Sequence, residues 1–323
     1  MPQKGLRIVY MGTPEFAVEP LRAILEKGWN VSAVVTVPDK PAGRGQKLSQ
    51  SAVKQFAMQQ NLPVLQPERL KDPEFVEQLQ NLQPDVMVVV AFRMLPEMVW
   101  RVPRLGTFNL HASLLPQYRG AAPINWAVIN GETKTGITTF LIDQQIDTGN
   151  ILLQQEVEIS QNETAGELHD RLMALGGRLV VETIELLAEK AIKPQAQELL
   201  ISSNSDIKPA PKLFKETCRI GWEKPATEVH NLIRGLSPYP AAWTELKTSG
   251  NAINAKILRS EMVNLHSTHE NPGKILTDNK SFLHVSCGTG AVAVNEIQLA
   301  GKRTLPTKDF LMGFKFTEDS FFF

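Results

Sequence analysis

The fold is decided by the stretch Leu6-Arg-Ile-Val-Tyr-Met-Gly-Thr-Pro-Glu-Phe16 and by the pattern that follows it. Its first six residues are typical of a strand buried on both faces, and the Gly-Thr-Pro turn leads into a helical pattern over 16–27. A second strand is predicted over 31–37. Strands that alternate with helices in this way indicate a doubly wound, mostly parallel sheet.

The alternation continues as far as residue 190, so we predict a Rossmann-like α/β domain over 1–190. Its last element is a long helix over 164–190, in which Thr164 and Glu167 have the spacing of a capping box. The other predicted elements are helices over 49–60 and 72–82 and strands over 85–92, 107–111, 136–142 and 151–157.

The pattern changes after residue 190. Residues 191–207 contain Pro194 and Ser202-Ser-Asn-Ser205 and are predicted to form an extended linker. Residues 208–323 hold short strand-like segments separated by turns, with one helix near 226–234. We therefore predict a smaller C-terminal β-barrel domain, OB-like, of a kind that often binds nucleic acid.

Length and composition limit the class of protein. A chain of 323 residues is longer than one hydrophobic core usually supports. The longest apolar run, 86–92, is too short to cross a bilayer, and the first residues show no signal-peptide pattern. Two cysteines form no disulfide framework. We expect a cytoplasmic enzyme.

Charge is spread unevenly although the net charge is zero. Residues 1–207 carry 19 Lys and Arg against 23 Asp and Glu, whereas residues 208–323 carry 15 against 11. The basic second half suits a polyanionic partner, but ordinary scatter between two domains explains the same numbers equally well.

Asn109 and His111 are the first candidate catalytic residues. They are two apart in the strand over 107–111, so their side chains point to the same face. A carboxamide donates to an oxygen that gains charge, and an imidazole transfers protons near neutral pH, which is the chemistry of acyl transfer. Asp147, in the polar cluster 143–149, is a candidate to orient the imidazole or to accept a proton. The alternative is that His111 is a structural histidine at a strand end.

A glycine-rich basic loop over 38–47 is a candidate binding segment. It carries Lys40, Arg44 and Lys47, and such a loop beside a pocket suits contacts to the phosphates of a large anionic substrate. A solvated surface loop is the alternative.

Other common sites are not indicated. The turn at Gly12 lacks the glycine patterns of dinucleotide and ATP sites, so we expect it to line a pocket at the ends of the strands. His266 and His269 have no acidic or thiol partners beside them, so we expect no metal.

These motifs together resemble the folate-dependent formyltransferases, over nearly the whole chain. The pairing of Asn-x-His with Asp-Thr-Gly is shared across that family, while the basic loop and the segment 233–238 favour the branch that acts on a charged tRNA. The segments that carry the resemblance are Met11-Gly-Thr-Pro-Glu-Phe-Ala17, Pro38-Asp-Lys-Pro-Ala-Gly-Arg-Gly45, Asn109-Leu-His-Ala-Ser-Leu-Leu-Pro116, Tyr118-Arg-Gly-Ala-Ala-Pro123, Asp147-Thr-Gly149 and Ile233-Arg-Gly-Leu-Ser-Pro238.

The resemblance implies a reaction and its participants. A formyl group would pass from 10-formyltetrahydrofolate to the α-amine of methionine on initiator tRNA, by direct aminolysis through a tetrahedral intermediate and without a metal. Asn109, His111 and Asp147 would carry the catalysis, and the loop with Lys40, Arg44 and Lys47 would meet the tRNA acceptor arm. The barrel would meet the tRNA body, and we expect a monomer. The residues implied to hold the folate are Ser113, Leu114, Leu115 and Pro116.

Two other functions remain open. One is a folate-dependent formyltransferase that acts on a sugar nucleotide or another small amine, and the other is a non-catalytic RNA-binding protein on the same scaffold. The chain also departs from the family at Phe92-Arg93, where Tyr-Gly is usual, and this change bears on how the folate pocket closes.

Overall fold

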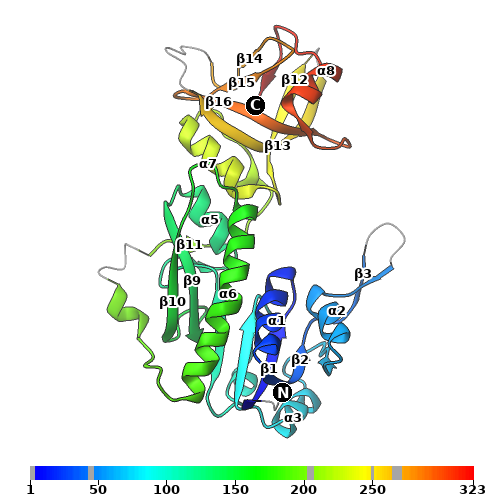
Figure 1. Ribbon diagram of the computed structural model, residues 1–323. Coiled ribbons are helices and arrows are strands. Elements are labelled where there is room, and N and C mark those ends of the chain that lie inside the picture. Colours follow the sequence, from blue (N-terminus) through cyan, green and yellow to red (C-terminus); the bar gives the residue numbers. More distant parts are fainter. Residues whose placement is uncertain (1–3, 43–46, 202–206, 249–250, 264–270) are drawn as a thin grey trace. The chain divides into compact units, whose positions relative to one another are not determined.

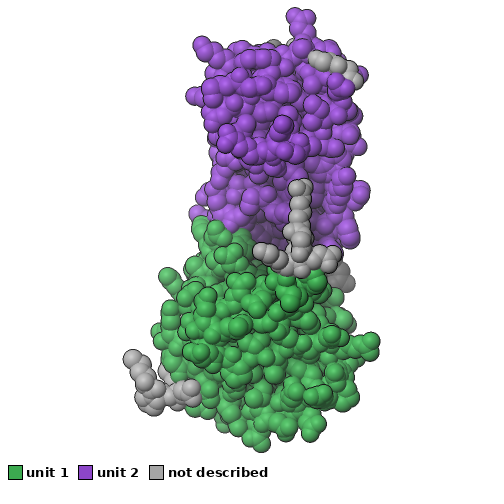
Figure 2. All heavy atoms as spheres, turned by 90° about the vertical axis from the view of Figure 1, so that its right-hand side faces the viewer, with its two compact units in different colours: residues 1–120, 135–157, 169–209 green, residues 121–134, 158–168, 210–323 purple. Residues whose placement is uncertain are grey.

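The computed structural model describes residues 4–42, 47–201, 207–248, 251–263 and 271–323. They form two compact units whose segments interleave along the chain (Figure 2). Most of residues 191–207 belong to the same unit as the preceding helix, so this division does not delimit a linker, and the linker stays a prediction. Unit 1 comprises residues 1–120, 135–157 and 169–209, and unit 2 comprises residues 121–134, 158–168 and 210–323.

Unit 1 is built on a seven-stranded sheet in the order β10-β9-β7-β6-β1-β2-β5. The strands from β7 to β5 are parallel to their neighbours, and β9 runs antiparallel to β7. The predicted mostly parallel sheet is therefore confirmed. Its strands are β1 (Lys4–Gly12), β2 (Trp29–Val35), β5 (Val64–Leu65), β6 (Val86–Val90), β7 (Thr107–His111), β9 (Lys134–Leu141) and β10 (Ile151–Glu158).

Helices cover both faces of this sheet (Figure 1). On one face α6 packs closely on α1 and on β7, because the side chain is missing at Gly176 and Gly177. On the other face α3 and α4 share an apolar cluster with β1 and β6. Apart from α5, which lies in unit 2, the remaining elements of the first 210 residues are α1 (Val18–Glu26), α2 (Ala52–Gln59), α3 (Pro73–Asn81), α4 (Glu97–Trp100), α6 (Ala165–Ala188), η1 (Glu15–Ala17), η2 (Gln197–Leu200), β3 (Lys40–Ala42), β4 (Lys47–Ser49), β8 (Arg119–Gly120) and β11 (Pro209–Ala210).

Local capping explains where the helices begin. Ser51 accepts a hydrogen bond from the Lys54 N–H, so α2 starts later than predicted, after the β3–β4 hairpin. The predicted capping box is confirmed. Thr164 Oγ1 accepts the Glu167 N–H at 3.2 Å, and Glu167 Oε2 accepts the Thr164 N–H at 2.9 Å.

Unit 2 contains the predicted C-terminal barrel. Its antiparallel strands follow the order β14-β15-β16-β13-β12-β18, with β17 beside β16, and a bridge between Lys274 and Phe321 joins the two ends of the series. The sheet is therefore nearly closed. Its elements are α5 (Pro123–Ile129), η4 (Glu216–Cys218), α7 (Ala226–Leu236), β12 (Ala242–Thr248), β13 (Asn251–Val263), β14 (Ile275–Thr277), β15 (Leu283–Ser286), β16 (Ala291–Leu299), β17 (Leu305–Pro306), α8 (Thr307–Gly313) and β18 (Phe321–Phe322).

The Arg-Gly-Leu-Ser-Pro segment has a structural role in unit 2. Arg234 is 5% exposed, and its Nη1 donates to the Glu163 carbonyl at 3.1 Å. Gly235 lets α5 and α7 approach, since a Cβ atom there would lie 2.9 Å from the Ile129 amide nitrogen. The segment therefore joins α7 to neighbouring parts of the same unit.

Within the described residues, the helices are all too short or too polar to cross a membrane.

Candidate active site

Asn109 and His111 lie on the face of the sheet opposite α6. Leu110, between them, faces α6, because a Cβ atom added to Gly176 would lie 2.7 Å from Leu110 Cδ2. Alternation along β7 turns its neighbours to the other face. Asn109 is in register with Val89 of the apolar cluster on that face. The two candidate side chains therefore share a face, as predicted.

The imidazole of His111 is buried, with 6% of its side chain exposed, and both ring nitrogens face oxygen atoms. Nε2 lies 2.9 Å from the Tyr118 carbonyl oxygen, and Nδ1 lies 3.8 Å from Asp147 Oδ2. A carbonyl oxygen only accepts hydrogen bonds, so Nε2 carries the proton in this contact. In this tautomer Nδ1, on the Asp147 side, is the nitrogen with the free lone pair.

Asp147 is held by the shape of its own loop. Its φ is 57°, in the left-handed region, and Oδ2 accepts the Gly120 N–H at 2.9 Å. Two residues later, a Cβ atom on Gly149 would clash with the Leu141 carbonyl oxygen. The glycine of the Asp-Thr-Gly pattern is therefore required by the close approach of the loop to β9.

Gln197 supports this loop and was not predicted from the sequence. It is fully buried, and its Nε2 donates to the backbone oxygens of Asp147 and Gly149 at 3.0 and 2.8 Å. Its Oε1 accepts from Arg119 Nε and Nη2 at 3.1 and 2.7 Å. Its partners are far away in the sequence and are mostly backbone groups, so no motif marks it.

The segment expected to hold the folate is packed inside unit 1. The side chains of Ser113, Leu115 and Pro116 are buried, and Leu114 is half-buried. Ser113 Oγ donates to the Gln117 carbonyl at 2.6 Å. The implied folate contacts of the four residues stay a prediction.

Arg93, one of the two residues at which the chain departs from the family pattern, forms hydrogen bonds between two loops. Its Nη1 donates to the Glu68 carbonyl at 3.0 Å and its Nη2 to the Pro67 carbonyl at 2.9 Å, while Nε is buried without a partner. Burial lowers the pKa of the Arg93 guanidinium. The loop after β6 is thus tied to the loop that follows β5.

The basic loop is described only in part. Lys40 is exposed at the start of the β3–β4 hairpin, and Lys47 lies in β4, with a side chain outside the described part. Arg44 lies outside the described residues, as do His266 and His269. In the rest of the chain, no group of three His, Cys, Asp or Glu side chains is placed to hold a metal ion.

Comparison with known proteins identifies the class. A model of the formyl transferase family matches residues 6–184, and a model of its C-terminal domain matches residues 212–315. The chain therefore belongs to the formyl transferase family.

Several similar curated proteins carry one particular name. Methionyl-tRNA formyltransferase from Bacteroides thetaiotaomicron is 54% identical over 98% of each chain. The proteins of that name from Flavobacterium johnsoniae and Porphyromonas gingivalis are 48% and 46% identical, over 98% and 99% of each chain.

Solved structures agree on the fold. The sugar 3N-formyl transferase WlaRD, solved with dTDP and 5-N-formyl-THF, superposes with a TM-score of 0.66 at 21% identity, over 92% of this chain and 99% of that one. HypX from Aquifex aeolicus in complex with tetrahydrofolic acid superposes with a TM-score of 0.63 at 16% identity, over 95% of this chain and 47% of that one.

Proposed function

We propose that this protein transfers the formyl group of 10-formyltetrahydrofolate to the α-amino group of methionyl initiator tRNA, for the start of translation. The approach of His111 Nδ1 to Asp147 Oδ2, at 3.8 Å, is the observation that carries the chemistry. The acceptor follows from the relatives, which are 54% identical over nearly the full chain.

The residues around this pair suit a folate donor, which supplies the activated formyl group. A flat ring needs an apolar wall beside a few polar groups. Phe92 and Ile142 are partly exposed members of the apolar cluster on the Asn109 face of the sheet. Because the side chains of Ser113, Leu115 and Pro116 are packed inside, that segment shapes the donor site mainly through its backbone.

Direct aminolysis needs an oxyanion donor and a route for one proton. The Asn109 carboxamide donates to the formyl oxygen as the acceptor nitrogen attacks. His111 Nδ1 and Asp147 take the proton that the nitrogen loses, and it is returned to the folate nitrogen as the C–N bond breaks. Tyr118 and Gly120 hold the two groups in place through their backbones.

The acceptor is a large anion, and the basic loop is the candidate contact for it. Lys40, Arg44 and Lys47 bind phosphates near the acceptor end, and unit 2 binds the tRNA body. The enzyme acts as a monomer in the cytoplasm. Size-exclusion chromatography with light scattering tests the monomer, with a dimer mass as the contrary result.

The site is tested by single substitutions in an assay with labelled donor and charged initiator tRNA. We expect His111→Ala and Asp147→Asn each to lower kcat by about 10²- to 10⁴-fold, the usual range for a lost general acid or base. Asn109→Ala should lower kcat by about 10²- to 10³-fold, because the oxyanion loses its donor.

Asp143→Asn is the matched control for the loop. Asp143 accepts from Thr148 Oγ1 at 2.8 Å and is exposed, and an amide oxygen can take the same bond. We expect near-wild-type transfer from this variant. Thermal unfolding must show that all variants are folded, and wild-type rates for folded His111→Ala and Asp147→Asn would refute the assigned roles.

A further inference from the structure

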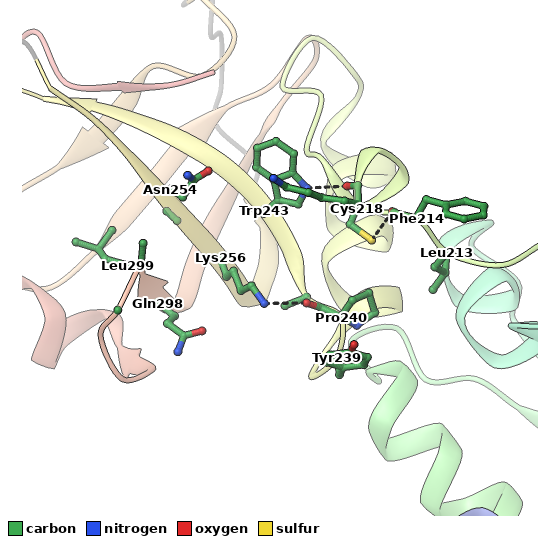
Figure 3. A pocket seen from close by; sticks show the side chains of 15 residues that line it. Leu213, Phe214, Cys218, Tyr239, Pro240, Trp243, Asn254, Lys256, Gln298 and Leu299 are labelled. Atoms are coloured by element: carbon green, nitrogen blue, oxygen red, sulfur yellow. Dashed lines mark hydrogen bonds between the residues drawn. The ribbon is translucent and has the colours of Figure 1, made fainter. Parts of the chain in front are cut away.

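A pocket within unit 2 is separate from the residues used for formyl transfer. Its volume is about 560 Å³, within the usual range for a small-ligand site. It lies between the segment before α7, the turn after α7, and strands β12, β13 and β16 (Figure 3). The lining residues used below are Phe214, Lys215, Tyr239, Trp243, Asn254 and Lys256.

Three aromatic side chains line this pocket. Tyr239 is 83% exposed and Phe214 is 59% exposed, more than the other exposed aromatic rings of the described residues, Phe282, Phe321 and Phe323. Trp243 is half-buried, and its Nε1 donates to the Lys215 carbonyl at 2.7 Å, which fixes the orientation of the ring. The pocket therefore offers aromatic surface to a flat ligand.

The charged groups of the pocket are positive. Lys215 Nζ lies 5.2 Å from the Trp243 ring centroid, and Lys256 Nζ donates to the Pro240 carbonyl at 3.1 Å. The fifteen lining residues include no carboxylate, and neither lysine forms a salt bridge within the described residues. Arg219, outside the lining, is paired with Glu245 at 3.6 Å. Glu216 is the nearby carboxylate that acts on the lining residue Cys218, and the charged side chains of the lining itself are both cations, which suits an anion.

We propose that this pocket binds one nucleotide, with the base against Tyr239 and Trp243 and the phosphate near Lys215 and Lys256. Stacking on aromatic rings combined with lysine contacts to phosphate is how proteins hold unpaired nucleotides. The amide of Asn254 lines the same wall and offers hydrogen bonds to a base edge. The inference rests on the proposed function, in which an unpaired tRNA nucleotide is the occupant. A free nucleotide has the same chemistry.

Binding of uncharged initiator tRNA to the full-length protein, without folate, tests the site. Tyr239→Ala should weaken the affinity by at least about fivefold, the lower end of the effect of losing one base stack. Lys256→Gln should also weaken it, by more than about twofold, because it removes a phosphate contact. Phe282→Ala and Lys308→Gln are matched controls, because they remove an exposed ring and an exposed lysine outside the pocket. We expect them to change the affinity less than twofold.

A second arm titrates adenosine monophosphate against the same variants. If Tyr239→Ala and Lys256→Gln lose binding of adenosine monophosphate but bind tRNA as wild type does, the occupant is a free nucleotide and the pocket remains a nucleotide site. If neither ligand responds to either variant, the inference is overturned. Formyl transfer is measured in parallel. If the wild-type enzyme formylates charged tRNA, the proposed function stands whatever the binding data show for the pocket. If it does not, the proposed function is refuted, and the binding data still decide whether the pocket holds a nucleotide.

Discussion

At the scale of the residue, the two nitrogens of His111 have different roles. The Tyr118 carbonyl fixes the proton on Nε2 and the orientation of the ring, so in the proposed reaction the substrate's proton goes to Nδ1 on the Asp147 side. Asp147 in turn has its backbone in a left-handed conformation, which a non-glycine residue adopts only when neighbours enforce it. The placement of the proposed catalytic pair therefore depends on backbone groups of Tyr118 and Gly120.

Gln197 is the positioning residue whose loss should be most informative. Gln197→Leu removes the donors to Asp147 and Gly149 and leaves those two carbonyls and the Arg119 guanidinium without a partner. We expect the free energy of unfolding to fall by about 2 kcal/mol, and kcat by at least about tenfold with the donor KM little changed. Steady-state kinetics on the folded variant at low temperature measure this. A less stable enzyme with unchanged kcat would show that Gln197 supports only the fold.

Cys287 gives a second prediction at this scale. Burial raises the pKa of its thiol to about 12, and burial also raises that of Cys218. Only the thiolate reacts with alkylating agents. We expect both cysteines of the native protein to resist iodoacetamide at pH 8 and to react fully in denaturant. Mass spectrometry measures the extent of alkylation at each cysteine, and rapid labelling of Cys287 in the native protein would contradict its burial.

At the scale of the element, the start of α6 shows how local and long-range contacts combine. The Thr164 backbone N–H, followed by Arg259, lowers the pKa of Glu167 from 4.5 to about 2. Arg259 Nη2 lies 2.7 Å from Glu167 Oε1, and both belong to unit 2. One carboxylate therefore caps the helix and ties it to the barrel strand β13.

The stability that Glu167 provides should depend on pH in a defined direction. Because its pKa is lower in the folded protein, the contribution is complete above about pH 5 and is lost as the pH falls toward 2. The side chain is 46% exposed, so solvent screening limits the effect to about 1 kcal/mol. Urea unfolding of Glu167→Gln should differ from wild type most at pH 7, and the difference should shrink below pH 5 and become small only near pH 2. Glu182→Gln, exposed on α6, is the control. A difference independent of pH would contradict this origin.

The elements that the sequence predicted well are those set by local patterns. The strand over 107–111 has the predicted limits, and the capping box marks the start of α6. β12 and β18 were not predicted. β18 is only two residues long, and it forms because it pairs with β12 and hydrogen-bonds to Gly273. In the site, Asn109, His111 and the Asp147 loop follow from motifs. Gln197 does not, since its partners lie about 50 residues away.

At the scale of the whole molecule, the proposed function requires an acceptor much larger than the catalytic site. Unit 2 holds most of residues 208–323, the part of the chain with an excess of basic residues. Each phosphate contact releases counterions, so affinity for tRNA falls as a power of the salt concentration. A small amine acceptor would lack this dependence.

We therefore expect kcat/KM for charged tRNA to fall by at least about tenfold between 50 and 200 mM salt, as for a protein with several phosphate contacts. The KM for the folate donor, a much smaller ligand, should change far less. Arg44→Ala should lower kcat/KM for tRNA and flatten the salt dependence, without weakening donor binding. Equal salt dependence for the two substrates would argue against an extended tRNA interface.

The most direct measurement of the central claim is the product itself. The purified protein is incubated with methionyl initiator tRNA and labelled 10-formyltetrahydrofolate, and the esterified amino acid is released and identified by mass spectrometry. We expect N-formylmethionine from the wild-type protein, and almost none from Asp147→Asn. Formylation of a small amine or sugar nucleotide with none on methionyl-tRNA, or no transfer at all, would contradict it.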